Sequence, residues 1–193
     1  MQRPRTQQER RADTQRALVS AARQLFAAKG YAATGTPEIV AAAGVTRGAL
    51  YHHYADKLAL FQTVVEQEQA LLAMAINAAT AGDDEPGPVK ALMAGGDAFL
   101  DAMQEPGRRQ ILLVDAPAVL GRDTLDASNA RHGLRTLIAG VNAAMDAKAI
   151  KALPALPLAH LLNALFDRAA MAEATELADY RKTIKALLRG LKT

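Results

Sequence analysis

Apolar residues recur at the three-and-four spacing of an amphipathic helix along almost the whole chain. Before residue 80, four such stripes predict helices over residues 17–29, 36–43, 47–54 and 56–79. Gly30 and Gly44 end the first two, since glycine readily adopts the backbone conformation that closes a helix. Three shorter helices are therefore expected to precede a much longer fourth.

A second group of stripes follows GDDEPGP, residues 82–88, which is the clearest boundary in the chain. Four or five further helices are expected there, with stripes over residues 89–103, 134–145, 158–169 and 180–191 and a short element at 108–121. Alanine and leucine, which favour helix, supply most of the apolar content, and aromatic residues make up only 4%. We predict an all-α fold of about nine helices, with one domain over residues 1–57 and another over 58–193.

The composition excludes several classes of protein. The 193 residues include no cysteine, which excludes disulfides, thiolate metal sites and a thiol nucleophile. No phosphate-binding glycine loop, nucleophile elbow or metal-spaced histidine set is present, so we expect neither an enzyme nor a cofactor. The basic N-terminus lacks the apolar stretch of a signal sequence, and no apolar run is long enough to span a membrane. A cytoplasmic location is expected.

Charge is distributed unevenly between the two expected domains. Residues 1–57 hold nine Lys or Arg and four Asp or Glu, a net charge of +5, whereas residues 58–193 hold fourteen and sixteen, a net charge of −2. A basic domain attracts polyanions, although +5 is also an ordinary surface charge for a domain of this size. The N-terminal arginines form either a nucleic-acid-binding arm or a solvated tail: Arg3, Arg5, Arg10 and Arg11.

The stretch AGVTRGALYHHYADK, residues 43–57, indicates which polyanion to expect. Two short helices joined by a turn at Gly44, after a longer helix, make a helix-turn-helix pattern whose second helix enters the DNA major groove. Arg47 suits a guanine edge, and Gly48 lets the backbone approach the duplex. Phosphate oxygens can be reached by Thr46, Tyr51, His52, His53 and Lys57. Adjacent helical residues point about 100° apart, so the two histidines are not expected to share a metal ion.

The chain from Leu18 to Lys57 closely resembles the start of proteins in the tetracycline-repressor (TetR) family of bacterial transcription regulators. The resemblance is carried by GYAAT, AAGVTRGALYHHY and DK at these intervals. It implies a homodimeric, all-helical regulator whose first three helices bind palindromic double-stranded DNA. The remaining helices would hold a small ligand and the dimer contact.

The resemblance also implies roles for individual residues. Thr34 and Thr36 match phosphate contacts at the start of the second helix, and Lys57 matches one at the start of the fourth. Positions of the second short helix that usually touch DNA are occupied by Thr46, Arg47, Ala49, Tyr51 and His52.

Three positions depart from the family pattern. Gly35 and Pro37 stand where the family more often has a hydroxyl residue and a polar residue. Tyr54 replaces the commoner phenylalanine and is expected in the core, where its hydroxyl needs a partner or water.

The last two helices are expected to form a four-helix interface across a twofold axis, as in the family. The predicted interface residues are Leu158, Leu161, Leu162, Leu165, Phe166, Ala169, Ile184, Leu187, Leu188 and Leu191. The alternative is that both stripes pack only on the core of their own subunit.

Candidate ligand-binding residues lie on three of the later helices. They are Leu92, Met93, Gly96, Phe99, Met103, Arg131, His160, Asn163 and Asp167. Gly96 either leaves space for a ligand or permits close helix packing. Arg131 either points into a pocket or lies at its solvent edge. His160, Asn163 and Asp167 form either the polar patch of a pocket or a solvated face. Met, Leu and Phe favour a mainly apolar organic ligand.

The expected function is that of a repressor which binds a palindromic operator as a homodimer and is released by a small, mainly apolar effector. An activator of the same fold, or an architectural DNA-binding protein without a ligand, is the alternative. A packed regulatory core without a cavity would favour the architectural protein.

Overall fold

The computed structural model describes residues 6–81, 87–121, 124, 127–128, 131 and 133–193. Within these residues there are nine α-helices, one π-helical segment and no strand, which confirms the predicted fold class. The elements are α1 (Gln7–Lys29), α2 (Thr36–Ala43), α3 (Arg47–His53), α4 (Lys57–Thr80), α5 (Pro88–Ala102), η1 (Gln110–Asp115), α6 (Ala116–Leu120), α8 (Gly133–Asp146), α9 (Ala155–Ala170) and α10 (Leu177–Gly190). Arg3, Arg5 and most of the predicted boundary at 82–88 lie outside the described residues.

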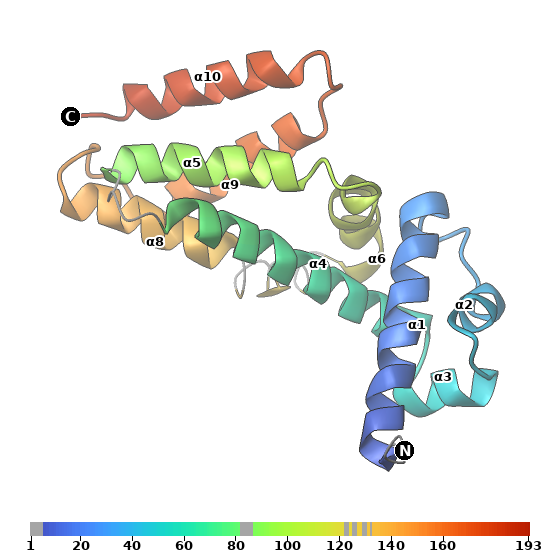
Figure 1. The fold of residues 1–193 in the computed structure, drawn as a ribbon. Coiled ribbons are helices and arrows are strands. Elements are labelled where there is room, and N and C mark those ends of the chain that lie inside the picture. The colour runs from blue at the N-terminus through green and yellow to red at the C-terminus, as the bar shows by residue number, and fades with distance from the viewer. Residues whose placement is uncertain (1–5, 82–86, 122–123, 125–126, 129–130, 132) are drawn as a thin grey trace, which may run out of the picture.

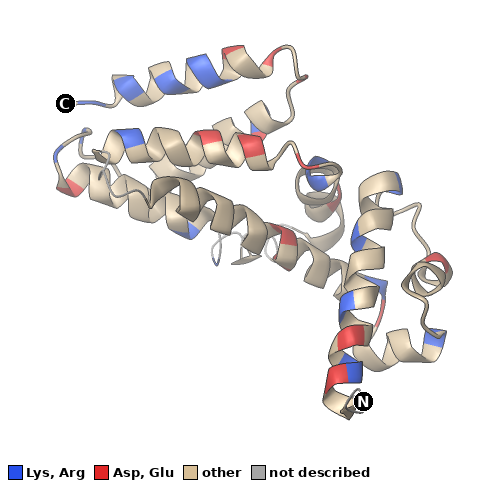
Figure 2. Ribbon diagram, viewed as in Figure 1, with Lys and Arg blue, Asp and Glu red and all other residues tan. Residues whose placement is uncertain are grey.

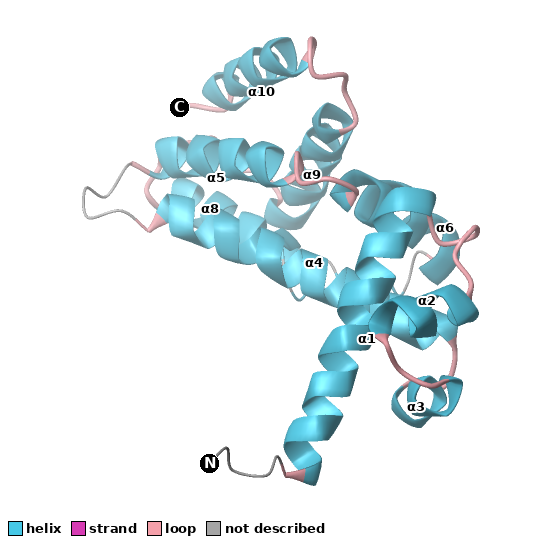
Figure 3. Ribbon diagram, turned by 45° about the vertical axis from the view of Figure 1, so that its right-hand side comes forward, coloured by secondary structure: helices cyan, strands magenta, loops and turns pink. Residues whose placement is uncertain are grey.

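The helices form two groups that α4 connects (Figures 1 and 3). Helices α1, α2 and α3 gather at one end of the molecule, where α1 crosses the first turns of α4. In the other group α5 and α8 pack against the rest of α4, α9 packs on α5 and α8, and α10 lies over α5 and α9. Both views place α3 at the end of the molecule opposite α10.

Local side-chain chemistry sets the ends of the short helices. The Thr46 hydroxyl accepts a hydrogen bond from the Ala49 amide at 3.2 Å and so caps α3, as its position before the stripe predicts. Asp56 caps α4 in the same way, with 2.8 Å from the Ala59 amide to its carboxylate. Gly44 closes α2 with a positive φ of 64°, a conformation that glycine adopts without a steric penalty.

Aromatic side chains from α1 and α4 join the N-terminal helices to the rest of the molecule. The rings of Phe26 and Phe61 meet edge to face with centroids 5.1 Å apart, and the Tyr31 ring lies 4.8 Å from that of Phe61. Ile39 of α2 and Leu50 of α3 are fully buried in the same core. The first turns of α4 thus complete the core of the N-terminal group, and the domain division at residue 57 stays a prediction.

Tyr54, which follows α3, is buried as expected, with 6% of its surface exposed. Among the described residues its hydroxyl is the one buried side-chain polar atom without a hydrogen-bond partner. A buried hydroxyl that has lost its water and gained no partner costs about 1–3 kcal/mol. The departure from phenylalanine therefore carries a penalty in stability.

Replacing Tyr54 with phenylalanine is expected to raise the free energy of unfolding by about 1 kcal/mol, because the ring is kept and the unpaired hydroxyl is removed. Urea denaturation followed by circular dichroism measures the change. Tyr180→Phe is the matched control, since that ring is partly exposed and packs under the Arg168 guanidinium at 5.1 Å. A less stable Tyr54→Phe protein would contradict the prediction.

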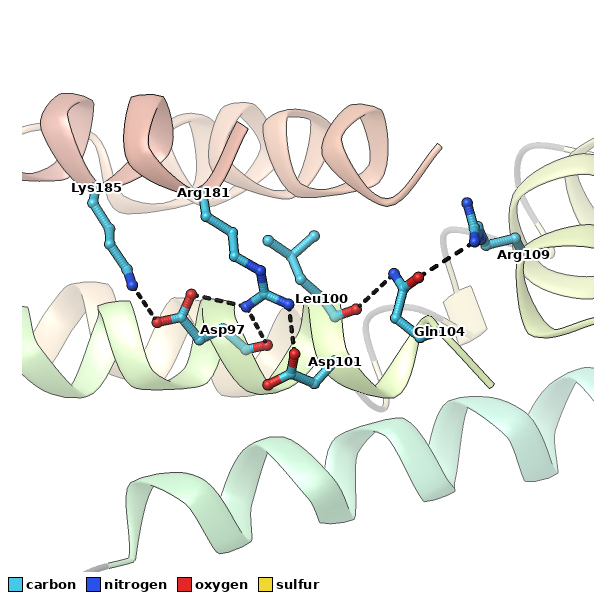
Figure 4. A network of polar contacts seen from close by, with 7 residues as sticks. All are labelled: Asp97, Leu100, Asp101, Gln104, Arg109, Arg181 and Lys185. Carbon is cyan, nitrogen blue, oxygen red and sulfur yellow. Dashed lines mark hydrogen bonds and ion pairs between the residues drawn. The ribbon is translucent and has the colours of Figure 1, made fainter. Parts of the chain in front are cut away.

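Charged residues hold α10 on α5 (Figure 4). Arg181 donates to the Asp97 carboxylate at 3.0 Å and also pairs with Asp101, while Lys185 pairs with Asp97 at 2.6 Å. Figure 2 shows basic residues along α10 and acidic residues on the neighbouring α5. Burial raises the pKa of Asp97, but the hydrogen bonds from Lys185 and Arg181 outweigh it and hold that pKa below its usual value.

The predicted interface stripes on α9 and α10 are divided between two surfaces. Five of the ten residues are buried within the subunit, which corrects their assignment to a dimer contact: Leu162, Phe166, Ala169, Ile184 and Leu188. Their stripe faces the subunit's own core, the alternative considered above. Leu161, Leu165 and Leu187 are 66%, 37% and 50% exposed, and Leu158 and Leu191 are intermediate.

None of the helices in the described segments is both long enough and apolar enough to cross a bilayer.

Candidate functional site

The outer face of α3 presents polar groups from two helices close together. Thr46, Arg47 and His52 are exposed, and Tyr51 is 44% exposed. The Arg47 guanidinium lies 5.5 Å from the centre of the Tyr51 ring. Hydrogen bonds with Thr36 and Arg47 lower the pKa of Tyr51, which places its hydroxyl between the start of α2 and the start of α3. Arginine, tyrosine and threonine donors therefore share one surface.

Gly48 and Ala49 complete this surface without adding bulk. A Cβ atom built on Gly48 would meet only the Thr46 hydroxyl, at 3.9 Å, so the leading turn of α3 is open to solvent. We name the surface made by the start of α2 and the outer face of α3 the recognition surface, and its members are Thr36, Thr46, Arg47, Gly48, Ala49, Tyr51 and His52.

His53 points away from His52 and towards α1. Burial lowers its pKa, and its electrostatic interactions with His52 and Arg11 lower it further. The two imidazole rings lie edge to face, with centroids 5.5 Å apart. His53 therefore lies between α3 and the N-terminal half of α1, at the edge of the recognition surface.

Thr34 does not belong to this surface, and its assignment as a phosphate contact is corrected. The side chain is 1% exposed, and its hydroxyl donates to the Gly30 carbonyl at 2.8 Å. The residue closes the turn between α1 and α2.

Lys57 occupies a position between the helices. Its ammonium donates to the carbonyls of Tyr31 and Thr34, both at 2.9 Å, and lies 3.9 Å from the centre of the Tyr31 ring. Two of its three N–H groups donate to the turn before α2, which leaves one that could donate to a DNA phosphate. The phosphate contact of Lys57 stays a prediction.

A cavity of about 650 Å³ lies in the second group of helices. Its walls come from α4, α5, η1, α8 and α9, and most of the lining is apolar. The predicted ligand residues that line it are Leu92, Gly96, Phe99, Met103, Asn163 and Asp167. Sequence analysis missed the wall formed by α4, η1 and α8: Leu72, Ile76, Thr80, Leu112, Leu113, Leu134, Leu137 and Gly140. Their helical stripes were visible in the sequence, but nothing there showed that these faces meet.

Gly96 permits close helix packing, one of the two roles considered for it, and its role in ligand binding stays a prediction. It lines the cavity, and a Cβ atom there would stand 2.5 Å from the Phe166 ring. The missing side chain thus lets α5 and α9 approach closely at the edge of the cavity.

Three predicted ligand residues lie elsewhere. Met93 packs on the α10 side of α5, because it is turned about 100° from Leu92 around the helix. Arg131 is exposed and its guanidinium pairs with Glu66 of α4, so it lies at the solvent edge. His160 is exposed on the outer side of α9 and is absent from the cavity lining.

Asp167 is the acidic residue of the cavity lining. Its Oδ2 accepts a hydrogen bond from the Asn163 amide at 2.8 Å, one helical turn earlier. Burial raises the pKa of Asp167 to about 6, and the Asn163 hydrogen bond opposes this only in part. The side chain forms no ion pair with any described residue.

Two polar links join the cavity walls to α1. The Asp115 carboxylate at the end of η1 accepts from the Tyr31 amide at 2.8 Å and from Gln110 at 3.0 Å, and it makes no cap on α6. Leu112 and Leu113 of the same segment line the cavity. A shift of η1 would therefore reach the end of α1 directly.

The second link is a buried ion-pair cluster centred on α4. Glu68 accepts from Arg23 of α1 at 3.2 Å and from Arg108, just before η1, at 2.7 Å. Burial raises the pKa of Glu68, but the hydrogen bonds from Arg108 and Arg23 outweigh it and lower that pKa. Arg108 also donates to the Ala102 carbonyl at the end of α5. Gln69, the next residue, lines the cavity, so one turn of α4 contacts both regions.

Two family models match the chain, one for each group of helices. Residues 18–64 match the model described as bacterial regulatory proteins, tetR family. Residues 89–192 match the model described as tetracyclin repressor-like, C-terminal domain.

Individual relatives agree with these matches. The chain is 29% identical to the Transposon Tn10 TetC protein of Escherichia coli, over 95% of this chain and 93% of that protein. It is 34% identical to the HTH-type transcriptional repressor BepR of Brucella suis, over 52% of this chain and 48% of that protein. The crystal structure of a TetR-family transcriptional regulator from Pectobacterium atrosepticum superposes with a TM-score of 0.77 at 30% identity and covers 98% of both chains.

Proposed function

The chain belongs to the TetR family of bacterial transcriptional regulators, and on that premise we propose that it is a homodimeric repressor released from its operator by a small organic effector. The observation that carries the proposal is the combination of a DNA-binding helix-turn-helix with a separate cavity in the second group of helices, joined by the links through Glu68 and Asp115. The chain acts in the cytoplasm as a binding protein and carries out no catalysis.

DNA is bound by the recognition surface. The first turn of α3 enters the major groove, where the Arg47 guanidinium donates to a guanine edge and the open backbone at Gly48 allows close approach. Thr36, Thr46 and Tyr51 donate to phosphates on either side. His52, His53 and the remaining proton of Lys57 extend the phosphate contacts along the groove.

Two copies bind a palindrome through a dimer contact on the outer faces of α9 and α10. The exposed leucines Leu161, Leu165 and Leu187 supply its apolar centre. Arg168 of α9 stacks on Tyr180 of α10 and so joins the two exposed faces into one surface. A twofold axis through this contact sets the distance between the α3 helices of the two subunits. That distance must be near 34–36 Å for both helices to enter the major groove one turn of DNA apart.

The effector binds in the cavity and changes that spacing. The effector contacts η1 and the turn of α4 around Gln69. A shift of these segments changes the position of α1, because Asp115 is hydrogen-bonded to Tyr31 after α1 and Glu68 to Arg23 within it. Coupling of this kind is reciprocal, so the operator weakens effector binding by the factor by which the effector weakens operator binding. A cavity of 650 Å³ favours this reading over an architectural protein with a packed core.

Selection of bound duplexes from a random DNA pool tests the proposal, and a palindrome is the expected result. Arg47→Ala is expected to lose about 1–3 kcal/mol of discrimination at one base pair of each half-site, because a bidentate base contact is removed. Lys57→Ala is expected to weaken all sites alike and to lower the salt dependence of binding. Fluorescence anisotropy at several salt concentrations measures both effects.

Arg189→Ala is the control for the change in charge, since Arg189 is exposed on α10 at the opposite end of the molecule. It should leave the selected sequence and its affinity unchanged. If the wild-type protein selects no palindrome, or if Arg47→Ala keeps full discrimination at every position, the assignment of α3 is wrong.

A further inference from the structure

The charged residues that line the cavity indicate which charge the effector carries. Asp167 projects from the last turn of α9 into a space lined mainly by apolar side chains. Its Oδ2 is held by Asn163 at 2.8 Å, which orients the carboxylate and leaves Oδ1 for another donor. The C-terminal end of a helix carries partial negative charge, which adds to the negative potential at this point.

Among the described residues, three basic groups on α9 and α10 near Asp167 have other partners. Arg168, the following residue, also lines the cavity, but it is exposed and its guanidinium stacks on the Tyr180 ring at 5.1 Å. On the neighbouring helices, Arg181 and Lys185 of α10 pair with Asp97 of α5, at 3.0 and 2.6 Å. A largely buried carboxylate without a cation is costly, and burial raises the pKa of Asp167 to about 6 against the opposing Asn163 hydrogen bond.

We propose that the effector is a mainly apolar organic cation, a protonated amine whose ammonium group pairs with Asp167 while its hydrocarbon part fills the space between α4, α5 and α8. This inference rests on the proposed function, because it takes the cavity as the effector site. An ammonium supplies the donor that Oδ1 lacks and compensates the buried charge. An anionic ligand would place like charges together, and a neutral one would leave the carboxylate uncompensated.

The remaining cavity lining fits this class of ligand. Thr80, Thr136 and Gln69 are the uncharged polar residues of the lining besides Asn163, and the rest of the wall consists largely of Leu, Ile, Phe and Met side chains. Asp167 and Arg168 are the charged residues of the lining, and the Arg168 guanidinium is stacked on the Tyr180 ring. Asp167 is thus the anchor at one end of an apolar chamber, which selects molecules with a single cationic group and an extended hydrocarbon body.

Three probes that share a hydrocarbon frame test the proposal: biphenyl-4-ylmethylamine, the corresponding alcohol and biphenyl-4-carboxylate. Isothermal titration of the full chain without DNA at pH 7.5 measures each affinity. The amine is expected to bind at least about 10-fold more tightly than the alcohol, and the carboxylate more weakly than either. Equal affinity for amine and alcohol, or no binding of any probe, would overturn the proposal.

Asp167→Asn is expected to abolish the preference for the amine and to retain binding of the alcohol, since the shape of the site is kept. Asp146→Asn, an equal charge change on an exposed residue at the end of α8, should keep the preference. An amine preference that survives Asp167→Asn would contradict the proposal.

The ligand-free thermal midpoint is an independent readout of the Asp167→Asn protein. The raised pKa means that the folded chain resists ionisation of Asp167, so this group lowers stability as the pH rises above about 4 and does so fully above pH 6. The amide removes that cost, and an increase of several degrees at pH 7.5 is expected. A lower midpoint would show that the charge is compensated within the subunit.

These measurements are separate from the test of the proposed function. If the chain selects a palindrome but prefers the neutral probe, only the ligand class is wrong. If the amine binds through Asp167 and no palindrome is selected, the DNA-binding role fails while the site remains.

Discussion

Glu68→Ala is expected to lower the free energy of unfolding by about 3–5 kcal/mol, because it leaves the buried Arg108 guanidinium without its carboxylate. The Glu68 side chain is 5% exposed and that of Arg108 10%. For a chain of this length the loss corresponds to a fall in thermal midpoint on the order of 10 °C. Differential scanning calorimetry measures it.

Glu66→Ala is the matched control, two residues earlier on the same helix. Glu66 pairs with Arg131 at the protein surface, where both side chains are more than one third exposed. Ion pairs in such positions contribute about 1 kcal/mol or less. A loss at Glu68 no larger than that at Glu66 would show that the cluster is solvated.

A double variant separates charge burial from lost packing. Glu68→Leu combined with Arg108→Met removes both buried charges and keeps apolar volume, so it should recover most of the stability that Glu68→Ala loses. The double variant should nevertheless respond less to effector, since Arg23 of α1 loses its link to α4.

Acid should remove the difference between the wild-type protein and Glu68→Ala. The folded-state pKa of Glu68 is lowered, so its contribution is present above the unfolded value of 4.5 and is lost as the pH falls through the folded value. Denaturation curves of the two proteins are therefore expected to converge at low pH and to diverge most near neutrality.

Leu161→Asp is expected to convert the proposed dimer into a folded monomer and to weaken operator binding by about 100-fold or more. The fold should persist, because the side chain is 66% exposed in the subunit. A buried aspartate at the centre of an apolar contact is costly, and a monomer loses the gain in effective concentration that links the two half-sites. Analytical ultracentrifugation and anisotropy with a full palindrome measure the two effects.

Leu71→Asp is the control for the same chemical change, since Leu71 is 50% exposed on α4, away from α9 and α10. It should leave both the mass and the affinity unchanged. A wild-type protein that is monomeric at micromolar concentration, or a Leu161→Asp protein that remains a dimer, would contradict the assignment of this face.

Asp167 also affects the stability of the ligand-free protein. Asp167 is retained in the cavity although its charge destabilises the ligand-free fold, and functional sites commonly carry such a cost. A cationic effector would therefore stabilise the chain both by binding and by compensating this charge.

The local elements were determined by the sequence itself. Thr46 before α3 and Asp56 before α4 act on amides three residues away, so neighbouring residues contain all the information that the caps require. The burial of Leu50 and Tyr54 follows similarly from their place in a short apolar stripe. The exposed polar face of α3, and with it the DNA-binding assignment, could be predicted from fifteen consecutive residues.

Only the tertiary structure decided which faces meet. Helical spacing shows that a stripe on α9 is apolar but does not name its partner, so Leu162 and Phe166 were placed in a dimer contact although they pack within the subunit. Glu68 lies 45 residues from Arg23, and Tyr31 lies 84 residues from Asp115. Contacts at such separations depend on how complete helices pack, and the cavity is the space that this packing leaves between their apolar faces.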